Sequence, residues 1–222
     1  MDDSSIQQTP FIKQLAANDR PTRDKALLSL RAYLSSTTRS LPPIELLKLH
    51  KGLFYSMWMC DRPLPQQHLA SSLASLLTIL PSTTLMPFLR AFWVTMSREW
   101  GGIDVLRMEK FLLLTRRYIG ATLAVLRDGE WEEGMVGEVT AVWEEVAFNV
   151  GDMKVANGVR FHCVDVFVDE LERVGALEEG SGAPVGVLLG PLRRLADGCP
   201  VKAVRVKARE ALADERLPGN EK

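Results

Sequence analysis

The sequence has little of several features that would define a functional class. Only three cysteines occur in 222 residues, and Cys60, Cys163 and Cys199 are widely spaced. A disulfide framework needs closely spaced, even-numbered cysteines, so we predict buried free thiols in a reducing compartment. No apolar run approaches the roughly 18 to 20 residues that cross a bilayer, and the acidic start Met1-Asp2-Asp3 is unlike a basic secretory signal. These absences predict a soluble, intracellular chain without membrane association.

Motifs that carry catalysis or bind metals are missing as well. The three histidines are far apart in the sequence, and no Gly-x-Ser-x-Gly elbow accompanies them. The pair Gly101-Gly102 lacks the following Gly or Lys of a phosphate-binding loop, and no Cys-x-x-Cys spacing for zinc is present. We therefore predict no enzyme activity, no catalytic residue, no cofactor and no metal.

What the chain does contain is helical periodicity. Apolar side chains make up 46% of the residues and recur at intervals of three and four almost throughout. Prolines, glycines and capping residues fall between these periodic segments. The expected helices cover residues 11–17, 21–35, 43–61, 66–80, 83–100, 104–127, 130–149, 155–174, 185–196 and 201–213. A strand at 185–189 stays open as an alternative.

This pattern predicts an all-α fold with about 8–10 antiparallel helices in one helical-repeat domain, residues 1–222. Two features favour a HEAT- or armadillo-like α-solenoid. The helices that start near Gln66 and Val155 are apolar around most of their circumference, as in a layer covered on both sides. Units of roughly 40 residues also recur, and prolines begin or flank the helical segments within them near residues 21, 42, 65 and 81. The alternative is a closed helical bundle.

Charge is distributed unevenly along the chain. Residues 1–125 hold 15 basic against 9 acidic side chains, residues 126–180 hold 4 against 14, and residues 181–222 hold 8 against 5. Such a distribution steers charged partners although the net charge is only −1. The alternative is that several solvated helix faces simply differ in sign.

A group of cations on the longest expected helix forms a candidate RNA-binding stripe. Arg107, Lys110 and Arg117 lie within about 80° around the helix axis. Guanidinium groups there suit bidentate contacts with phosphate. The full candidate set also takes in Arg116 and, on the preceding helix, Arg90 and Arg98. An ordinary solvated face explains the same spacing equally well.

A polar strip on the helix near residues 155–174 is a candidate partner-binding site. Its members are His162, Asp165, Asp169 and Glu172, which share one helix face. Three interpretations fit this strip: a metal site, an internal ion-pair network, or a surface that binds a partner. We favour the ion-pair network and predict no metal there.

Tryptophans near charged residues complete the candidate set. Trp58 precedes Asp61 and Arg62, and Trp100 follows Arg98-Glu99. Aromatic side chains at helix ends are frequent anchors of protein interfaces. Trp58, Asp61, Arg62 and Trp100 are therefore candidate partner-binding residues, with burial in the core as the alternative for the aromatic ones.

Four segments of the chain are distinctive, and they are Phe11-Ile-Lys-Gln-Leu-Ala-Ala-Asn-Asp19, Lys51-Gly-Leu-Phe-Tyr-Ser-Met-Trp-Met-Cys-Asp61, Ala91-Phe-Trp-Val-Thr-Met-Ser-Arg-Glu-Trp-Gly-Gly-Ile-Asp104 and Asn157-Gly-Val-Arg-Phe-His162. In sequence and in order they resemble one known family, the ribosomal RNA-processing protein 1 (Nop52-type) nucleolar factors of the large ribosomal subunit. The resemblance covers roughly residues 11–175 and weakens through the helical part at 184–213.

The resemblance implies a non-enzymatic assembly factor of the nucleolus. Members of this family are helical-repeat proteins of pre-60S particles, needed for processing the internal spacers of precursor rRNA. Their partners include a Brix-domain factor, a zinc-binding factor and a WD-repeat factor. We expect a monomeric helical scaffold that docks such factors, and the alternative is direct binding of pre-rRNA through a basic helix face.

Overall fold

A computed structural model describes residues 11–36 and 41–220, and only helices, turns and loops occur among them. The predicted all-α class is thus confirmed, and residues 185–189, where a strand stayed open, are helical at 185–188. No helix of the described ranges is long and apolar enough to cross a membrane. The acidic start of the chain lies outside the described residues.

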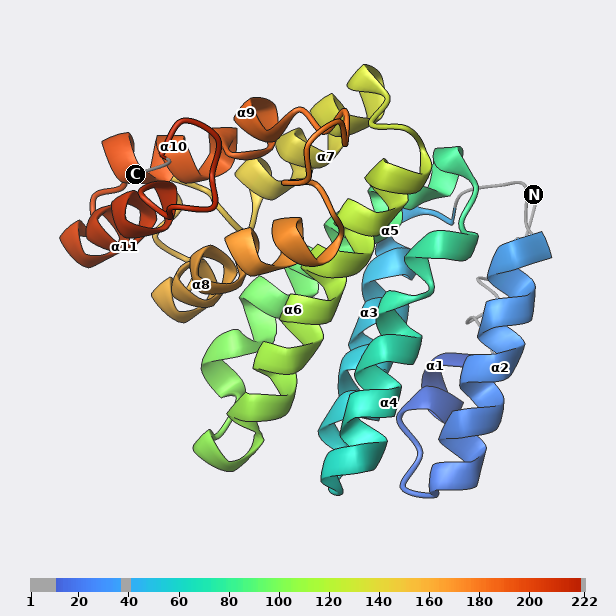
Figure 1. The fold of residues 1–222 in the computed structure, drawn as a ribbon. Helices are drawn as coiled ribbons and strands as arrows, with labels where there is room; N and C mark the ends of the chain where they lie inside the picture. Colours follow the sequence, from blue (N-terminus) through green and yellow to red (C-terminus); the bar gives the residue numbers. More distant parts are fainter. Residues whose placement is uncertain (1–10, 37–40, 221–222) are drawn as a thin grey trace, which may run out of the picture. The chain divides into compact units, whose positions relative to one another are not determined.

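The chain divides into two compact units, residues 1–95 and 96–222. The solenoid and the single repeat domain remain predictions. Unit 1 contains α1 (Phe11–Leu15), α2 (Arg20–Ser36), α3 (Pro43–Trp58), α4 (Pro63–Ala74), η1 (Leu77–Ile79) and most of α5 (Ser82–Glu99). Unit 2 contains η2 (Trp100–Gly102), α6 (Val105–Asp128), α7 (Glu133–Glu145), α8 (Asn157–Arg173), α9 (Val185–Leu188), α10 (Gly190–Gly198) and α11 (Lys202–Leu212) (Figure 1).

In unit 1, α1 packs against both α2 and α3. The helix α2 begins as its capping sequence predicts, because the Asp19 carboxylate accepts hydrogen bonds from the Thr22 amide at 2.9 Å and the Thr22 hydroxyl at 2.6 Å. These bonds lower the pKa of Asp19. Buried Arg23 donates to the carbonyls of Ala17 and Asn18 and to Met59, and so joins the α1–α2 turn to the end of α3.

The helix expected at 66–80 differs from the prediction. It begins at Pro63 and stops at Ala74, and a separate 3₁₀ turn follows at Leu77–Ile79. The Ser75 and Thr78 hydroxyls donate to backbone carbonyls three residues earlier, which competes with continuous helix. Only Ala70, Leu73 and Ala74 of α4 are buried, so the expectation that this helix is covered on both sides was wrong.

In unit 2, α8 packs between α6 and α11, and α10 packs against α11 and α7 (Figure 1). Buried residues surround most of α8, as its sequence predicts. A cluster of edge-on rings, with centroids 5.4 to 6.3 Å apart, is formed by Trp143 of α7, Phe148 of the following loop and Phe167 of α8. This cluster fixes α7 to α8.

The helix expected at 130–149 begins three residues late. Glu130 and Trp131 adopt positive φ angles of 54° and 57°, which a right-handed helix excludes. Glu132 then caps α7, since its carboxylate accepts from the Gly134 and Met135 amides, and these bonds lower its pKa.

The loop between α7 and α8 is held by one buried arginine. The Arg160 guanidinium is 1% exposed and donates to the backbone carbonyls of Asn149, Asp152 and Val155 at 2.7 to 2.9 Å. It also reaches the Asn157 side chain at 3.2 Å. A buried cation is thus satisfied mainly by peptide oxygens, and burial lowers its pKa.

Candidate functional site

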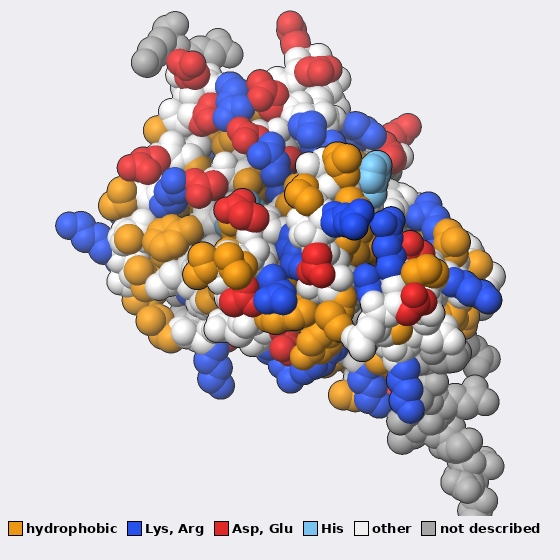
Figure 2. Space-filling model, turned by 90° about the horizontal axis from the view of Figure 1, so that it is seen from below, with side chains coloured by type: hydrophobic (Ala, Val, Ile, Leu, Met, Phe, Trp, Pro, Cys, Tyr) orange, Lys and Arg blue, Asp and Glu red, His pale blue; other side chains and the backbone are white. Residues whose placement is uncertain are grey.

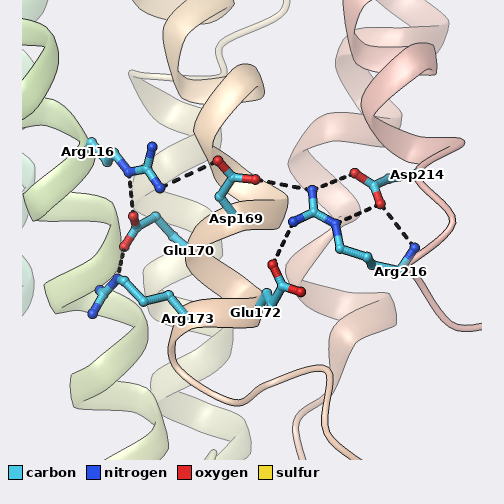
Figure 3. A network of polar contacts seen from close by, with 7 residues as sticks. All are labelled: Arg116, Asp169, Glu170, Glu172, Arg173, Asp214 and Arg216. Atoms are coloured by element: carbon cyan, nitrogen blue, oxygen red, sulfur yellow. Dashed lines mark hydrogen bonds and ion pairs between the residues drawn. The ribbon is translucent and has the colours of Figure 1, made fainter.

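The strip predicted on α8 is engaged in contacts within unit 2 (Figure 3). Asp169 pairs with Arg116 of α6 at 3.4 Å and with Arg216, beyond α11, at 3.1 Å. Glu172 pairs with Arg216 at 2.7 Å. Of the three interpretations, the ion-pair network is confirmed, and α8 is joined by it to elements on both sides.

The buried member of this network is a residue that the sequence analysis missed. Glu170 is fully buried, and its carboxylate receives Arg116 Nε at 2.7 Å and Arg173 Nε at 2.6 Å. It lies directly against Gly120 of α6, where a Cβ atom would come within 2.1 Å of Glu170 Oε2. The sequence signal was Gly120 itself, a glycine in the interior of an otherwise strong helix.

Arg216 closes the network from the chain segment after α11. Its guanidinium contacts Asp214, Glu172 and Asp169, and these carboxylates raise its pKa further. The other members of the strip are also occupied. Asp165 pairs with Lys207 of α11 at 2.5 Å, which raises the pKa of Lys207.

His162 has a structural partner in α6. Its Nε2 lies 2.7 Å from the carbonyl oxygen of Leu112, and because a carbonyl only accepts, Nε2 carries the hydrogen. Burial lowers the pKa of His162. Among the described residues no group of three or more His, Cys, Asp or Glu side chains could hold a metal ion. All three cysteines are free and buried.

The predicted RNA-binding stripe is only partly on the surface. Lys110 is 4% exposed, so its placement there was wrong: that face of α6 turns into the core of unit 2, although the spacing alone suggested solvent. Arg107 pairs with the capping residue Asp104, and Arg116 is neutralised by the α8 network. Arg117 is half-buried, whereas Arg98 in unit 2 and Arg90 in unit 1 are exposed.

The two candidate tryptophans differ in their exposure to solvent. Trp100 is 6% exposed and packs against α8, where a Cβ on Gly158 would lie 2.7 Å from the indole Nε1. The expectation that it faces a partner was therefore wrong. Trp58 in unit 1 is half-buried beside Phe54 and Tyr55, and the adjoining Asp61 and Arg62 are exposed. This corner between α3 and α4 stays a candidate contact surface.

The acidic charge that remains available lies elsewhere, around the turn between α6 and α7. The Trp131 indole donates to the Ser181 carbonyl at 3.1 Å and ties this turn to the 175–184 loop. Five exposed glutamates on these segments form no ion pair within the described part of the chain. We use the name acidic surface for this set, which belongs to the α6–α7 turn, the first two turns of α7 and the 175–184 loop: Glu130, Glu133, Glu138, Glu178 and Glu179.

Charges of both signs cover the face shown in Figure 2. Basic and acidic side chains both lie there, and hydrophobic side chains reach the surface between them.

Comparisons with known proteins show the family of this chain. The family model described as "Nucleolar protein, Nop52" matches residues 6–222. The chain is 39% identical over 171 residues to ribosomal RNA processing protein 1 homolog A of Mus musculus and 39% over 183 residues to that of Homo sapiens. It is 32% identical over 190 residues to the Drosophila melanogaster homolog.

These alignments cover 75%, 79% and 83% of this chain but only 34%, 40% and 27% of the relatives. The chain thus spans about a third of the length of the curated relatives it matches. The family resemblance predicted from the four sequence segments is confirmed, as is the nucleolar location that the family description carries. The chain belongs to the Nop52 family of nucleolar proteins.

Proposed function

We propose that this chain is a helical docking module that serves ribosomal RNA processing during assembly of the large ribosomal subunit, without enzymatic activity. The names of the relatives, ribosomal RNA processing protein 1 homologs, support the process. The partners expected from the resemblance, a Brix-domain, a zinc-binding and a WD-repeat factor, belong to this proposal. So does the monomeric state within pre-60S particles.

The acidic surface is the observation that carries the docking role. Its glutamates are exposed and form no ion pair with a cation among the described residues, whereas the carboxylates of the α8 strip are already paired. Proteins that assemble on rRNA are rich in Lys and Arg, and complementary charge accelerates and orients their encounter. The acidic surface therefore receives a basic segment of a partner protein.

Charge reversal tests this role. The double variant Glu133→Lys/Glu138→Lys is expected to reduce at least tenfold the recovery of partner factors with the tagged chain at physiological salt. The matched control is Asp197→Lys/Glu215→Lys, which reverses two exposed carboxylates of the same unit that form no ion pair with described residues. Equal recovery with both double variants would remove the acidic surface as a docking site.

Direct pre-rRNA binding is less well supported. Of the six candidate cations, Lys110 is buried and Arg107 and Arg116 already pair with carboxylates. Phosphate contacts by the remaining arginines predict retardation of structured RNA that weakens steeply with salt. The substitutions Arg90→Ala and Arg98→Ala test that alternative in the same binding assay.

A further inference from the structure

A groove in unit 1 is a surface feature that the proposed function leaves unexplained. It has a volume of about 450 Å³ and runs between α2 and α4 over the end of α3. One wall presents Arg20, Asp24, Leu27, Leu28 and Arg31 of α2. The opposite wall presents Pro65, His68, Leu69 and Ser72 of α4, and the floor consists of Arg23, Ser56, Cys60 and Leu76.

The groove has the length of a short helix. Its wall on α2 extends from Arg20 to Arg31, twelve residues whose first and last are about 16 Å apart along the helix axis at a rise of 1.5 Å per residue. A docked helix of about three turns spans that distance. One end is closed by Arg31, whose guanidinium donates to the Ser75 hydroxyl at 2.9 Å just beyond α4.

Apolar side chains on the walls are unusually open to solvent. Leu28 is 69% exposed, and Leu27 and Leu69 are half-buried beside it. Leucine side chains held in this way are typical anchors for the apolar face of an amphipathic helix. The groove lining includes no Phe, Tyr or Trp on which a nucleic-acid base would stack, which disfavours single-stranded RNA as the occupant.

The charged residues that line the groove favour a partner with negative charge. Three arginines line it against one carboxylate, that of Asp24, which already pairs with Arg20 at 3.3 Å. Arg23 donates to backbone carbonyls and also interacts electrostatically with the Asp19 carboxylate, which is not part of the groove lining. Arg31 has only the neutral Ser75 hydroxyl as a partner among the described residues. A positive excess therefore surrounds an apolar channel.

We propose that this groove binds an amphipathic helix of another protein whose apolar face carries leucine-type side chains and whose flanks are acidic. The inference goes beyond the proposed function, because that role uses the acidic surface of unit 2 and a basic partner segment. The leucines of the partner fill the space beside Leu28 and Leu69, and its carboxylates reach Arg20 and Arg31 at the rim.

The test is peptide selection on the complete chain. A displayed library of 16-residue peptides fixes leucines at helical spacing and randomises the remaining positions. We expect enriched peptides to carry net negative charge and to lose at least tenfold in affinity, by fluorescence anisotropy, against Leu28→Asp and against Arg31→Glu. Because both side chains are exposed, neither substitution removes core packing.

A matched control makes the result specific. Leu106 of α6 is 93% exposed in unit 2, so Leu106→Asp introduces the same change outside the groove and is expected to leave peptide affinity unchanged. The proposal is overturned if no peptide is enriched, if enriched peptides are neutral or basic, or if they bind Leu28→Asp normally. Self-association of the chain that Leu28→Asp abolishes would also overturn it, in favour of a second copy as the occupant.

Discussion

The Arg116 side chain of α6 reaches the fully buried carboxylate of Glu170 on α8, with Nε and Oε1 2.7 Å apart. Arg173 binds the other carboxylate oxygen at 2.6 Å. Gly120 leaves the space that this carboxylate occupies. An acid that the interior would otherwise exclude is thereby neutralised twice, and it links two helices of unit 2.

Replacing Gly120 tests whether this space is needed. A Cβ at this position would come within 2.1 Å of both Glu170 Oε2 and Arg173 Nη2, so Gly120→Ala displaces the carboxylate from its partners. We expect the free energy of unfolding to fall by about 3 kcal/mol, the lower end of the range for a broken buried ion pair. Urea denaturation followed by circular dichroism measures it.

Gly137 provides the matched control for this experiment. It lies in α7, and a Cβ there would meet no atom within 4 Å. Gly137→Ala should therefore stabilise the chain by about 0.5 to 1 kcal/mol, because alanine loses less backbone entropy in a helix. If Gly120→Ala were equally stabilising, the close packing around Glu170 would be disproved.

The buried and exposed carboxylates of α8 should differ sharply in their contributions. Glu170→Ala leaves two guanidinium groups beside an unfilled space and should cost about 3 kcal/mol. Asp169→Ala removes exposed ion pairs, which contribute about 0 to 1 kcal/mol. Both variants are compared in thermal and urea unfolding. Similar losses for the two would contradict the special role of the buried carboxylate.

The buried His50 side chain should make the folded chain less stable in mild acid. It is buried in unit 1 with its ring 4.3 Å from that of Phe88, and burial lowers its pKa from 6.5 to about 3. The unfolded chain thus takes up the proton first as the pH falls below 6.5. Stability is fully present above that pH and declines towards pH 3, by about 3 kcal/mol at pH 4.

The variant His50→Leu isolates this contribution. Other groups also titrate in acid, so the informative quantity is the difference between the pH profiles of the two proteins. Urea unfolding at pH 7 and pH 4 should show a loss about 3 kcal/mol smaller in the variant. Parallel profiles would show that His50 does not govern acid sensitivity.

The turn before α7 provides a substitution expected to stabilise. Glu130 adopts φ of 54°, a conformation that costs a residue with a Cβ about 1 kcal/mol or more and glycine almost nothing. Glu130→Gly should therefore raise the free energy of unfolding by up to about 1 kcal/mol, after the greater entropy of an unfolded glycine is subtracted. A lower melting temperature in calorimetry would argue against strain at this residue.

The sequence predicts the helical class and most helix positions, because periodicity and caps are local properties. Asp19 and Asp104 cap α2 and α6 where the pattern places helix starts. The sequence did not predict the end of α4 at Ala74, where serine and threonine hydroxyls compete for backbone carbonyls. It also did not predict the positive φ angles at Glu130 and Trp131, which are uncommon for residues with side chains.

For the candidate residues as well, the sequence predicts which side chains share a helix face and does not predict their partners from distant segments. Helical spacing placed Asp165, Asp169 and Glu172 on the same side of α8, but their partners Lys207 and Arg216 come from much later in the chain. Spacing likewise grouped Lys110 with Arg107, yet only packing shows that Lys110 is buried. The acidic surface also depends on the distant contact between Trp131 and Ser181.

The manner in which Arg160 holds the α7–α8 loop has an evolutionary consequence. Its bonds to Asn149, Asp152 and Val155 all end on peptide oxygens, which every amino acid possesses. Met153 and Lys154, within the same loop, point their side chains into solvent. Mutations at these two sites can accumulate without altering the course of the loop, whereas loss of the single arginine would remove the donor that three of its carbonyls share.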